Sequence, residues 1–540
     1  MLSKTIRIVA LVSIIAAAFS FAPVAMAGPA SCGNRNNNTH AKLLECVTLE
    51  GVREHQAAFQ AIANDNGGTR AAGTPGYEAS VAYVVERLTA AGYNVTLDEF
   101  PFLFFPPAVL QQLTPVNAAY ESGVFTASGV GAVTASVTPV DINLVPPRAN
   151  TSGCQGAYTE AAVGAAIVPA APGSPTDFAG FPAGNIALIQ RGGCSFALKA
   201  YNAQAAGASA MVLFNQGDTP ARSTLIVGTL VVAAGTPGPV TIPVVGGSFA
   251  AGESLAQPGS TARVVVEAPR NVTQVNVLAE SQGGDPNNVV MAGAHLDSVQ
   301  AGPGINDNGS GSAALIEVAE QMSKVTPRNK VRFAWWGAEE SGLIGSTQYV
   351  AGLSQAELDR ITLYLNFDMI GSPNHVFFIY DGDNSDGVGS PAGPAGSAEI
   401  EKTFEAFFNM RGIPFKGTDF SGRSDYGPFI AAGVDIPSGG LFTGAEGIKT
   451  AAEVALWGGT AGQQYDPCYH LACDTFANNN DFALDVNSDA VAFSILQYAM
   501  STQDINDAQG KGNFPPVSGG GSSNTSTSTQ SGHDHELPAE

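Results

Sequence analysis

The sequence predicts an α/β fold, in which a mostly parallel, twisted sheet is flanked by helices and carries an inserted β-rich module. Two observations support this prediction. After Asn271, segments typical of strands and of helices alternate along the chain, which favours a parallel centre of the sheet. Between about 125 and 270 the chain is instead rich in Ala, Val, Gly, Thr and Pro and contains short strand-like runs.

The individual elements follow from hydrophobic periodicity and from turn residues. Ahead of the module we expect a helix over about 77–91 that stops at Gly92, and then a strand over 94–102. In the module we expect one helix over about 197–206 and strands at 186–190, 211–214 and 263–267. After the module we expect strands at 289–295, 330–337 and 361–370, and helices at 310–325, 343–353 and about 486–500.

Length and charge exclude some classes of protein. With 540 residues the chain is long enough for two or three domains, and 44% hydrophobic with 13% charged residues is a globular composition. The formal net charge of −23 argues against a nucleic-acid partner, because phosphates require basic patches. The acidity is compatible with an exported enzyme but does not indicate a substrate.

Both ends of the chain differ from the rest. Lys4 and Arg7 precede an apolar run, and Ala25-Met26-Ala27 supplies a small-x-small cleavage pattern, so residues 1–27 are predicted to be a signal peptide. An uncleaved membrane anchor is the alternative. No other stretch reaches the roughly 18 unbroken apolar residues of a membrane helix. Residues 515–540 are of low complexity and are predicted to be a flexible tail.

The six cysteines fall into three pairs by position. In an exported protein, extracellular or periplasmic, this pattern indicates three disulfides. A cysteine-ligated metal is the alternative, but the close doublets of structural zinc sites are absent. The expected pairs are Cys32–Cys46, Cys154–Cys194 and Cys468–Cys473.

Polar residues follow several of the predicted strands. The set comprises His295, Asp297, Asp307, Glu339, Glu340 and Asp368. In an α/β sheet such residues meet at the carboxyl edge, and buried carboxylates are costly unless they are paired or bind a metal. A mixture of imidazole and carboxylate suits zinc. No H-E-x-x-H and no G-x-S-x-G motif occurs, which argues against a one-zinc helix type of protease and a serine hydrolase.

Six segments together resemble the secreted di-zinc aminopeptidases, whose family also includes glutamate carboxypeptidases and the transferrin receptor. They appear in the order typical of that family: GAHLDS (293–298), GINDNGSG (304–311), WWGAEESGLIGS (335–346), NFDMIG (366–371), GRSDYGPF (422–429) and DPCYHLACD (466–474). The resemblance implies a fold of the zinc exopeptidase type and two zinc ions per chain. It implies five metal ligands: His295, Asp307, Glu340, Asp368 and His470.

The same resemblance implies how these residues act. Asp307 would bridge both ions, Glu339 would be the general base, and Tyr469 would donate to the oxyanion. Asp297 would orient His295 as an outer-shell carboxylate. Arg423 resembles a position near the substrate, and a structural salt bridge is the alternative for it.

A second resemblance concerns the inserted module. Residues 184–216 look like the centre of a protease-associated (PA) domain, a non-catalytic module that often shapes access to an active site. The predicted organisation is a signal peptide (1–27), the N-terminal part of the peptidase domain (28–124), the PA domain (125–270), the zinc peptidase catalytic domain (271–514) and the tail (515–540). A passive spacer is the alternative for the module.

We therefore expect a secreted, monomeric metalloaminopeptidase that acts on peptides with a free N-terminus and favours hydrophobic residues such as Leu. Three alternatives remain open. A carboxypeptidase would need cations to hold the substrate carboxylate, whereas Arg423 is the only cation in the recognised motifs. A receptor-like binding module would have lost metal ligands, and a glutaminyl cyclase would hold one zinc. Tyr426 is a departure from the family pattern that bears on substrate preference.

Overall fold

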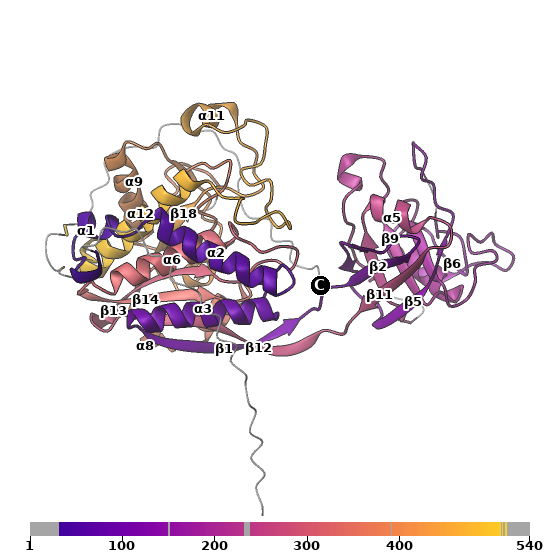
Figure 1. Ribbon diagram of the computed structural model, residues 1–540, viewed down its shortest axis with the longest axis horizontal. Helices are drawn as coiled ribbons and strands as arrows, with labels where there is room; N and C mark the ends of the chain where they lie inside the picture. The colour runs from indigo at the N-terminus through magenta and orange to yellow at the C-terminus, as the bar shows by residue number, and fades with distance from the viewer. Residues whose placement is uncertain are drawn as a thin grey trace, which may run out of the picture. The chain divides into compact units, whose positions relative to one another are not determined.

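The computed structural model describes residues 32–149, 152–231, 238–389, 391–508, 510 and 514–515. The predicted signal peptide lies outside the described residues, as does the predicted tail apart from Pro515. The chain divides into two compact units. One unit is Glu99–Gln274, and the other combines Met1–Asp98 with Val275–Glu540. Figure 1 shows the two units, which we call the inserted unit and the peptidase unit.

An eight-stranded sheet forms the centre of the peptidase unit, in the order β1-β12-β14-β13-β15-β18-β16-β17. Its strands are β1 (Asn94–Phe104), β12 (Arg270–Glu280), β13 (Asp285–His295), β14 (Asn329–Trp336), β15 (Ile361–Phe367), β16 (Phe378–Tyr380), β17 (Lys416–Thr418) and β18 (Ser438–Phe442). The pairs from β14 through β13 and β15 to β18 are parallel, whereas β12 and β16 join the sheet antiparallel. The predicted α/β class with a parallel centre is confirmed.

Strand β13 shows why this sheet has a core on each face. Val290, Ala292 and Ala294 belong to one buried cluster. Their neighbours Val289 and Met291 belong to the other. Alternate side chains of a strand point to opposite faces, so an uninterrupted apolar run requires cover on both sides.

Helices cover both faces of the sheet. The larger cluster is covered by α1 (His40–Leu44), α2 (Leu49–Asp65), α3 (Pro75–Ala91), α6 (Gly309–Met322), α9 (Ser397–Arg411) and α12 (Asp481–Met500). The smaller cluster packs against α7 (Ile344–Gly352), α8 (Gln355–Leu358) and α10 (Gly427–Ile430). The short helices α11 (Ala451–Trp457) and α13 (Gln503–Asn506) complete the unit. Helices α6 and α12 pack on strands β13 and β14, and α2 packs on α6 and α12 (Figure 1).

Turn and capping residues set the ends of several helices and strands. Helix α3 has Pro75 at its first turn and ends at Gly92, whose φ of 90° is the left-handed conformation that favours glycine. Strand β1 follows two residues later. Asn308 caps α6 by accepting a hydrogen bond from the Gly311 amide, 2.9 Å away.

The inserted unit has its own eight-stranded sheet, in the order β3-β2-β11-β5-β8-β9-β10-β4. Its strands are β2 (Val109–Thr114), β3 (Ala118–Tyr120), β4 (Gly123–Val124), β5 (Gly131–Pro139), β8 (Ile186–Gln190), β9 (Ala210–Phe214), β10 (Val244–Gly247) and β11 (Thr261–Val266). A separate pair joins β6 (Tyr158–Glu160) to β7 (Ile167–Pro169), and helices α4 (Phe196–Ala205) and α5 (Phe249–Leu255) pack on the strands.

The inserted unit begins earlier than the predicted module at 125. Residues 109–124 join its sheet because β2 pairs with β11 and β4 pairs with β10. These partners lie more than 100 residues away, so local periodicity carries no sign of the pairing. Both β1 and β12 run across the boundary between the two units.

The described chain has three disulfides, which join Cys32 to Cys46, Cys154 to Cys194 and Cys468 to Cys473. Within the ranges given above, no helix combines the length and the apolar character needed to cross a membrane.

Candidate metal centre

The carboxyl ends of three neighbouring parallel strands bring the predicted side chains together. His295 is the last residue of β13, Asp368 directly follows β15, and Glu339 and Glu340 follow β14 closely. Because these strands are adjacent and parallel, their ends lie at one edge of the sheet. Asp307 reaches the same edge from the loop that precedes α6.

The two oxygens of Asp307 face two different histidines. Oδ1 lies 3.3 Å from His295 Nε2, and Oδ2 lies 3.3 Å from His470 Nε2. A second carboxylate completes each side. Asp368 Oδ1 lies 3.2 Å from His295 Nε2, and Glu340 Oε2 lies 3.0 Å from His470 Nε2. The five side chains therefore form two groups of three that share Asp307.

These spacings fit the requirements of zinc. With metal–ligand bonds of about 2.0–2.2 Å, tetrahedral ligand atoms lie about 3.3–3.6 Å apart. Three distances in the centre are 3.2–3.3 Å: those from His295 Nε2 to Asp307 and to Asp368, and that from His470 Nε2 to Asp307. One ligand atom each from His295, Asp307 and Glu340 lies within 4.8 Å of the others, as do atoms of His295, Glu339 and Asp368.

The electrostatics of the centre also call for a cation. Burial and the negative charge of Asp307 raise the pKa of Glu340 to about 7. Burial lowers the pKa of His470, but the charge of Glu340 and its contact with Asp307 raise that pKa to about 11. Acidic groups packed this closely in a buried place are stable only beside positive charge, which a divalent metal supplies.

The backbone holds His295 in a ligating orientation. The carbonyl oxygen of Asp297 lies 3.1 Å from His295 Nδ1, which leaves Nε2 directed at Asp307 and Asp368. The Asp297 carboxylate lies farther away, with Oδ1 3.6 Å from Nδ1. That carboxylate accepts hydrogen bonds from the amides of Glu339, at 3.1 Å, and Glu340, at 3.4 Å. Asp297 thus positions three residues of the centre at once.

A second tether joins the loop of Tyr469 and His470 to Asp307. The Cys468–Cys473 disulfide closes this loop, and the Asp474 carboxylate accepts the amides of Asn306 and Asp307 at 2.8 and 2.9 Å. The rings of Tyr469 and His470 stack with centroids 3.8 Å apart. Burial raises the pKa of Tyr469 well above its ordinary value, so its hydroxyl keeps its proton.

Three residues at this centre have a left-handed backbone conformation. Ala338, Met369 and His470 have φ values of 56°, 49° and 57°, and each of them is, or adjoins, a residue of the cluster. A side chain in the left-handed region is unfavourable and persists only where the surroundings enforce it, which is a common property of functional sites.

Two buried residues near the centre, Arg70 and Asp425, have no role that the sequence predicts. The guanidinium of Arg70 is fully buried and donates to the carbonyls of Leu296, Pro303 and Gly304, which form the loop between β13 and Asp307. Asp425 is buried as well, and burial together with the charge of Glu339 raises its pKa well above the usual range. Asp425 lies in the recognised GRSDY segment, whereas no pattern marked Arg70.

Arg423 lies in the loop between β17 and α10 and is partly exposed. It precedes Ser424, whose hydroxyl donates to Asp368 Oδ2 at 2.7 Å. His375 is buried and contacts Phe377 edge to face, with ring centroids 5.1 Å apart.

Comparisons with known proteins agree with this geometry. The family model of peptidase family M28 matches residues 276–495, and that of the PA domain matches residues 140–255. An aminopeptidase of Pseudomonas aeruginosa is 47% identical over 480 residues, which cover 87% of this chain and 84% of the relative. A probable lipoprotein aminopeptidase of Mycobacterium tuberculosis is 42% identical over 461 residues, or 84% and 85% of the two chains.

Two further relatives extend the comparison. Leucine aminopeptidase 2 of Trichophyton equinum is 49% identical over 331 residues, which cover 60% of this chain and 64% of that protein. The solved structure of a zinc aminopeptidase from Bacillus subtilis matches with a TM-score of 0.55 at 22% identity, over 87% of this chain and 99% of that chain. This structure supports the fold.

Fold, site and relatives together define an aminopeptidase of the metallopeptidase class. The chain belongs to peptidase family M28, and it carries a PA domain in addition to the peptidase domain.

Proposed function

We propose that the chain holds two zinc ions and removes the N-terminal residue of peptides. His295, Asp307 and Asp368 would hold one ion, and His470, Asp307 and Glu340 would hold the other. The single observation that carries this proposal is the Asp307 carboxylate, which presents one oxygen to each histidine at 3.3 Å. When bound, zinc supplies a water that ionises near neutral pH and a Lewis acid for the scissile carbonyl.

The protein's own groups move the protons. Glu339 takes a proton from the attacking water and passes it to the leaving amine. It suits this role because it is fully buried, because Oε2 lies 3.9 Å from His295 Nε2, and because its amide is fixed by Asp297. The Tyr469 hydroxyl donates to the oxyanion of the tetrahedral intermediate, and its ring is fixed by stacking on His470.

The substrates in this proposal are peptides with a free N-terminus, and hydrophobic residues such as Leu are favoured. A substrate carboxylate would need cations to hold it, and Arg423 is the only cation in the recognised motifs. The leucine aminopeptidases of Trichophyton support the preference for Leu. Arg423 contacts the substrate from the loop before α10.

The protein acts outside the cytoplasm as a monomer, exported by residues 1–27. Its three disulfides support this location, because such bonds persist in oxidising compartments.

Hydrolysis of leucyl-p-nitroanilide by the purified protein tests the proposal. The N-acetylated compound serves as the matched control, and each is assayed with and without a zinc chelator. We expect cleavage of the free-amine compound alone, lost on chelation and restored by zinc. Equal cleavage of both compounds, or activity that survives chelation, would contradict the proposal.

A further inference from the structure

A second cluster of metal-ligand side chains lies among the helices, away from the strand ends. It consists of His55 on α2 and of Glu317 and Glu320 on α6, and one ligand atom of each lies within 4.8 Å of the other two. Residues three apart on a helix share a face, so both carboxylates of α6 point the same way. Glu317 lies ten positions after Asp307, or about 15 Å at 1.5 Å per helical residue, so the two clusters are separate.

Two polar atoms of this cluster are buried and lack hydrogen-bond partners. His55 and Glu317 are both fully buried. Neither His55 Nε2 nor Glu317 Oε2 has a hydrogen-bond partner at normal geometry among the described residues. The Glu317 carboxylate as a whole lies beside the Thr48 backbone, and its Oε1 accepts from Gln321 Nε2 at 3.3 Å. His55 Nε2 and Glu317 Oε2 lie 3.9 Å apart, which is too far for a hydrogen bond. Because uncompensated buried polar atoms are costly, their approach indicates a ligand between them.

The imidazole of His55 is held as a metal-binding histidine is held. Its Nδ1 lies 2.7 Å from the hydroxyl of Tyr83 on α3, which leaves Nε2 directed at Glu317. A ligating histidine uses its other ring nitrogen in this way. Burial and the charge of Arg87 lower the pKa of His55 to about 3, so the ring is neutral, as a ligand must be.

Glycine at position 51 makes room for the carboxylate. A Cβ atom there would lie 2.6 Å from Glu317 Oε2, closer than atoms can approach. The sequence of α2 therefore accommodates the carboxylate of Glu317 against its backbone.

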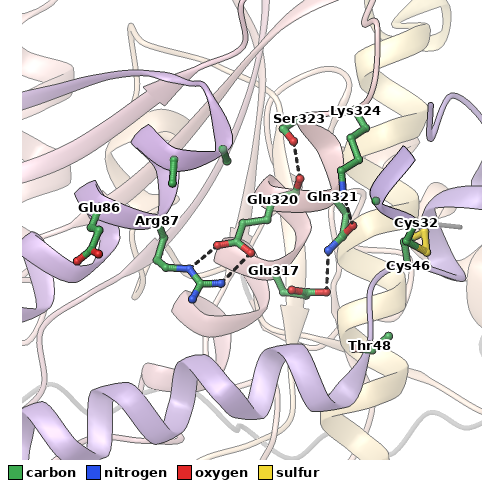
Figure 2. Close-up of a pocket in the computed structure, with 13 residues that line it drawn as sticks. Cys32, Cys46, Thr48, Glu86, Arg87, Glu317, Glu320, Gln321, Ser323 and Lys324 are labelled. Atoms are coloured by element: carbon green, nitrogen blue, oxygen red, sulfur yellow. Dashed lines mark hydrogen bonds and ion pairs between the residues drawn. A yellow bond between two sulfur atoms is a disulfide. The ribbon is translucent and has the colours of Figure 1, made fainter. Parts of the chain in front are cut away.

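The charges of the neighbourhood leave space for one divalent cation. Arg87 Nε and Nη2 lie 2.6 and 3.0 Å from the two oxygens of Glu320, and Nη1 lies 3.1 Å from Glu54 Oε1. Figure 2 shows Arg87 directed at Glu320, with Glu317 beyond it. With Glu317 ionised, three carboxylates face the Arg87 guanidinium, and one further group of each sign, Glu86 and Lys324, lines the same pocket, so two negative charges remain.

A pocket leads to the cluster. Its volume is about 780 Å³, and Glu317, Glu320 and Arg87 belong to its lining (Figure 2). The pocket therefore reaches the two carboxylates of the cluster, whereas His55 does not line it.

We propose that His55, Glu317 and Glu320 bind a divalent cation of the zinc class and that this ion clamps α2 to α6. A neutral imidazole beside carboxylates selects zinc or a similar transition metal over calcium and magnesium, which prefer oxygen ligands. Glu320 keeps its contact with Arg87, as ligating carboxylates commonly keep an outer hydrogen bond. The ion is additional to those of the catalytic centre.

Zinc content per chain tests the proposal. The full chain and the variant His55→Gln are dialysed against zinc, freed of excess metal and measured by mass spectrometry of the elements. We expect the variant to hold one zinc less per chain, whatever number the catalytic centre holds, with hydrolysis of leucyl-p-nitroanilide within twofold of the unaltered protein. Glu317→Gln, which keeps the shape of the side chain, should lose the same ion.

The control is His375→Gln, because His375 is also buried but lies outside both clusters. Its zinc content should be unchanged. Crystals grown with zinc should show an anomalous peak between His55 Nε2 and Glu317 Oε2. Equal zinc in the unaltered chain, His55→Gln and Glu317→Gln would overturn the site. A loss of zinc accompanied by a parallel loss of activity would also overturn it, because the missing ion would then be catalytic.

Discussion

The hydroxyl of Ser424 donates a 2.7 Å hydrogen bond to Oδ2 of Asp368. This contact turns the other oxygen, Oδ1, toward His295, 3.2 Å away. The Ser424 hydroxyl itself accepts from Asn366 Nδ2 at 2.8 Å, so its direction is defined. A loop between β17 and α10 thereby controls the orientation of a side chain at the end of β15.

Ser424→Ala should therefore weaken zinc binding. Removal of an outer hydrogen bond to a metal ligand typically costs about 10–100-fold in metal affinity or activity. Titration with a competing chelator measures the affinity. Ser421→Ala, at an exposed position of the same loop, is the control and should behave as the unaltered protein. An unchanged affinity in Ser424→Ala would show that Asp368 is oriented by other contacts.

Glu339→Gln should keep its metal and lose most of its turnover. The amide has the shape of the carboxylate but cannot accept a proton, and loss of a general base costs about 10²–10⁴-fold in rate. Zinc content and kcat for leucyl-p-nitroanilide are measured on one preparation. The exposed Glu267 provides the matched control variant Glu267→Gln. Near-normal kcat in Glu339→Gln would assign the base to another group.

Replacement of Cys468 and Cys473 by Ser should lower zinc affinity about tenfold, in the range of outer-shell changes. The closed loop holds His470 at a φ of 57°, and an open loop can relax out of this unfavourable conformation. The affinity is measured by the same chelator competition. A variant without the Cys154–Cys194 bridge, in the inserted unit, is the control. Equal affinities in both variants would show that the Cys468–Cys473 bridge is dispensable for the centre.

Arg70→Met should destabilise the peptidase unit by about 1–3 kcal/mol, the usual cost of leaving buried hydrogen-bonding groups without a partner. Three carbonyls of the loop 296–304 would lose their donor. Urea denaturation measures the loss of stability. Arg360→Met removes an exposed guanidinium and should change the stability little. A small effect in both variants would mean that water replaces the guanidinium.

The stability of the inserted unit should rise with pH above neutrality. Lys199 is fully buried, and burial lowers its pKa from 10.5 to about 7. Between pH 7 and 10.5 the unfolded chain therefore binds more protons than the folded unit, and stability increases with pH wherever this holds. Urea unfolding at several pH values measures the slope. Lys199→Met should remove it, and an equal slope in both proteins would contradict the assignment to Lys199.

The strand ends explain why so much of the centre was predictable. His295, Asp307 and Asp368 each stand beside a strong local signal, namely a buried strand or a glycine-rich loop before a helix. Parallel strands then bring these ends together without further information. The α/β class and the β-rich module follow from local periodicity for the same reason.

Other features depend on contacts that no local pattern records. Arg70 donates hydrogen bonds to three carbonyls that lie more than 220 residues away in the sequence. Residues 109–124 alternate like any edge strand, and only their partners in β10 and β11 assign them to the inserted unit. His55 and Glu317 each resemble ordinary residues of an amphipathic helix, and only the packing of α2 on α6 brings them together.

The inserted unit leaves and rejoins the peptidase sheet through β1 and β12, which are neighbouring strands at one edge of that sheet. Neighbouring strands lie about 4.8 Å apart, a gap that a tight turn can close. In evolution, the whole insertion could thus be gained or lost as one unit. A hairpin that joins β1 directly to β12 would leave the edge of the peptidase sheet unchanged. The catalytic residues, all encoded downstream of β12, would keep their order and their scaffold through either event.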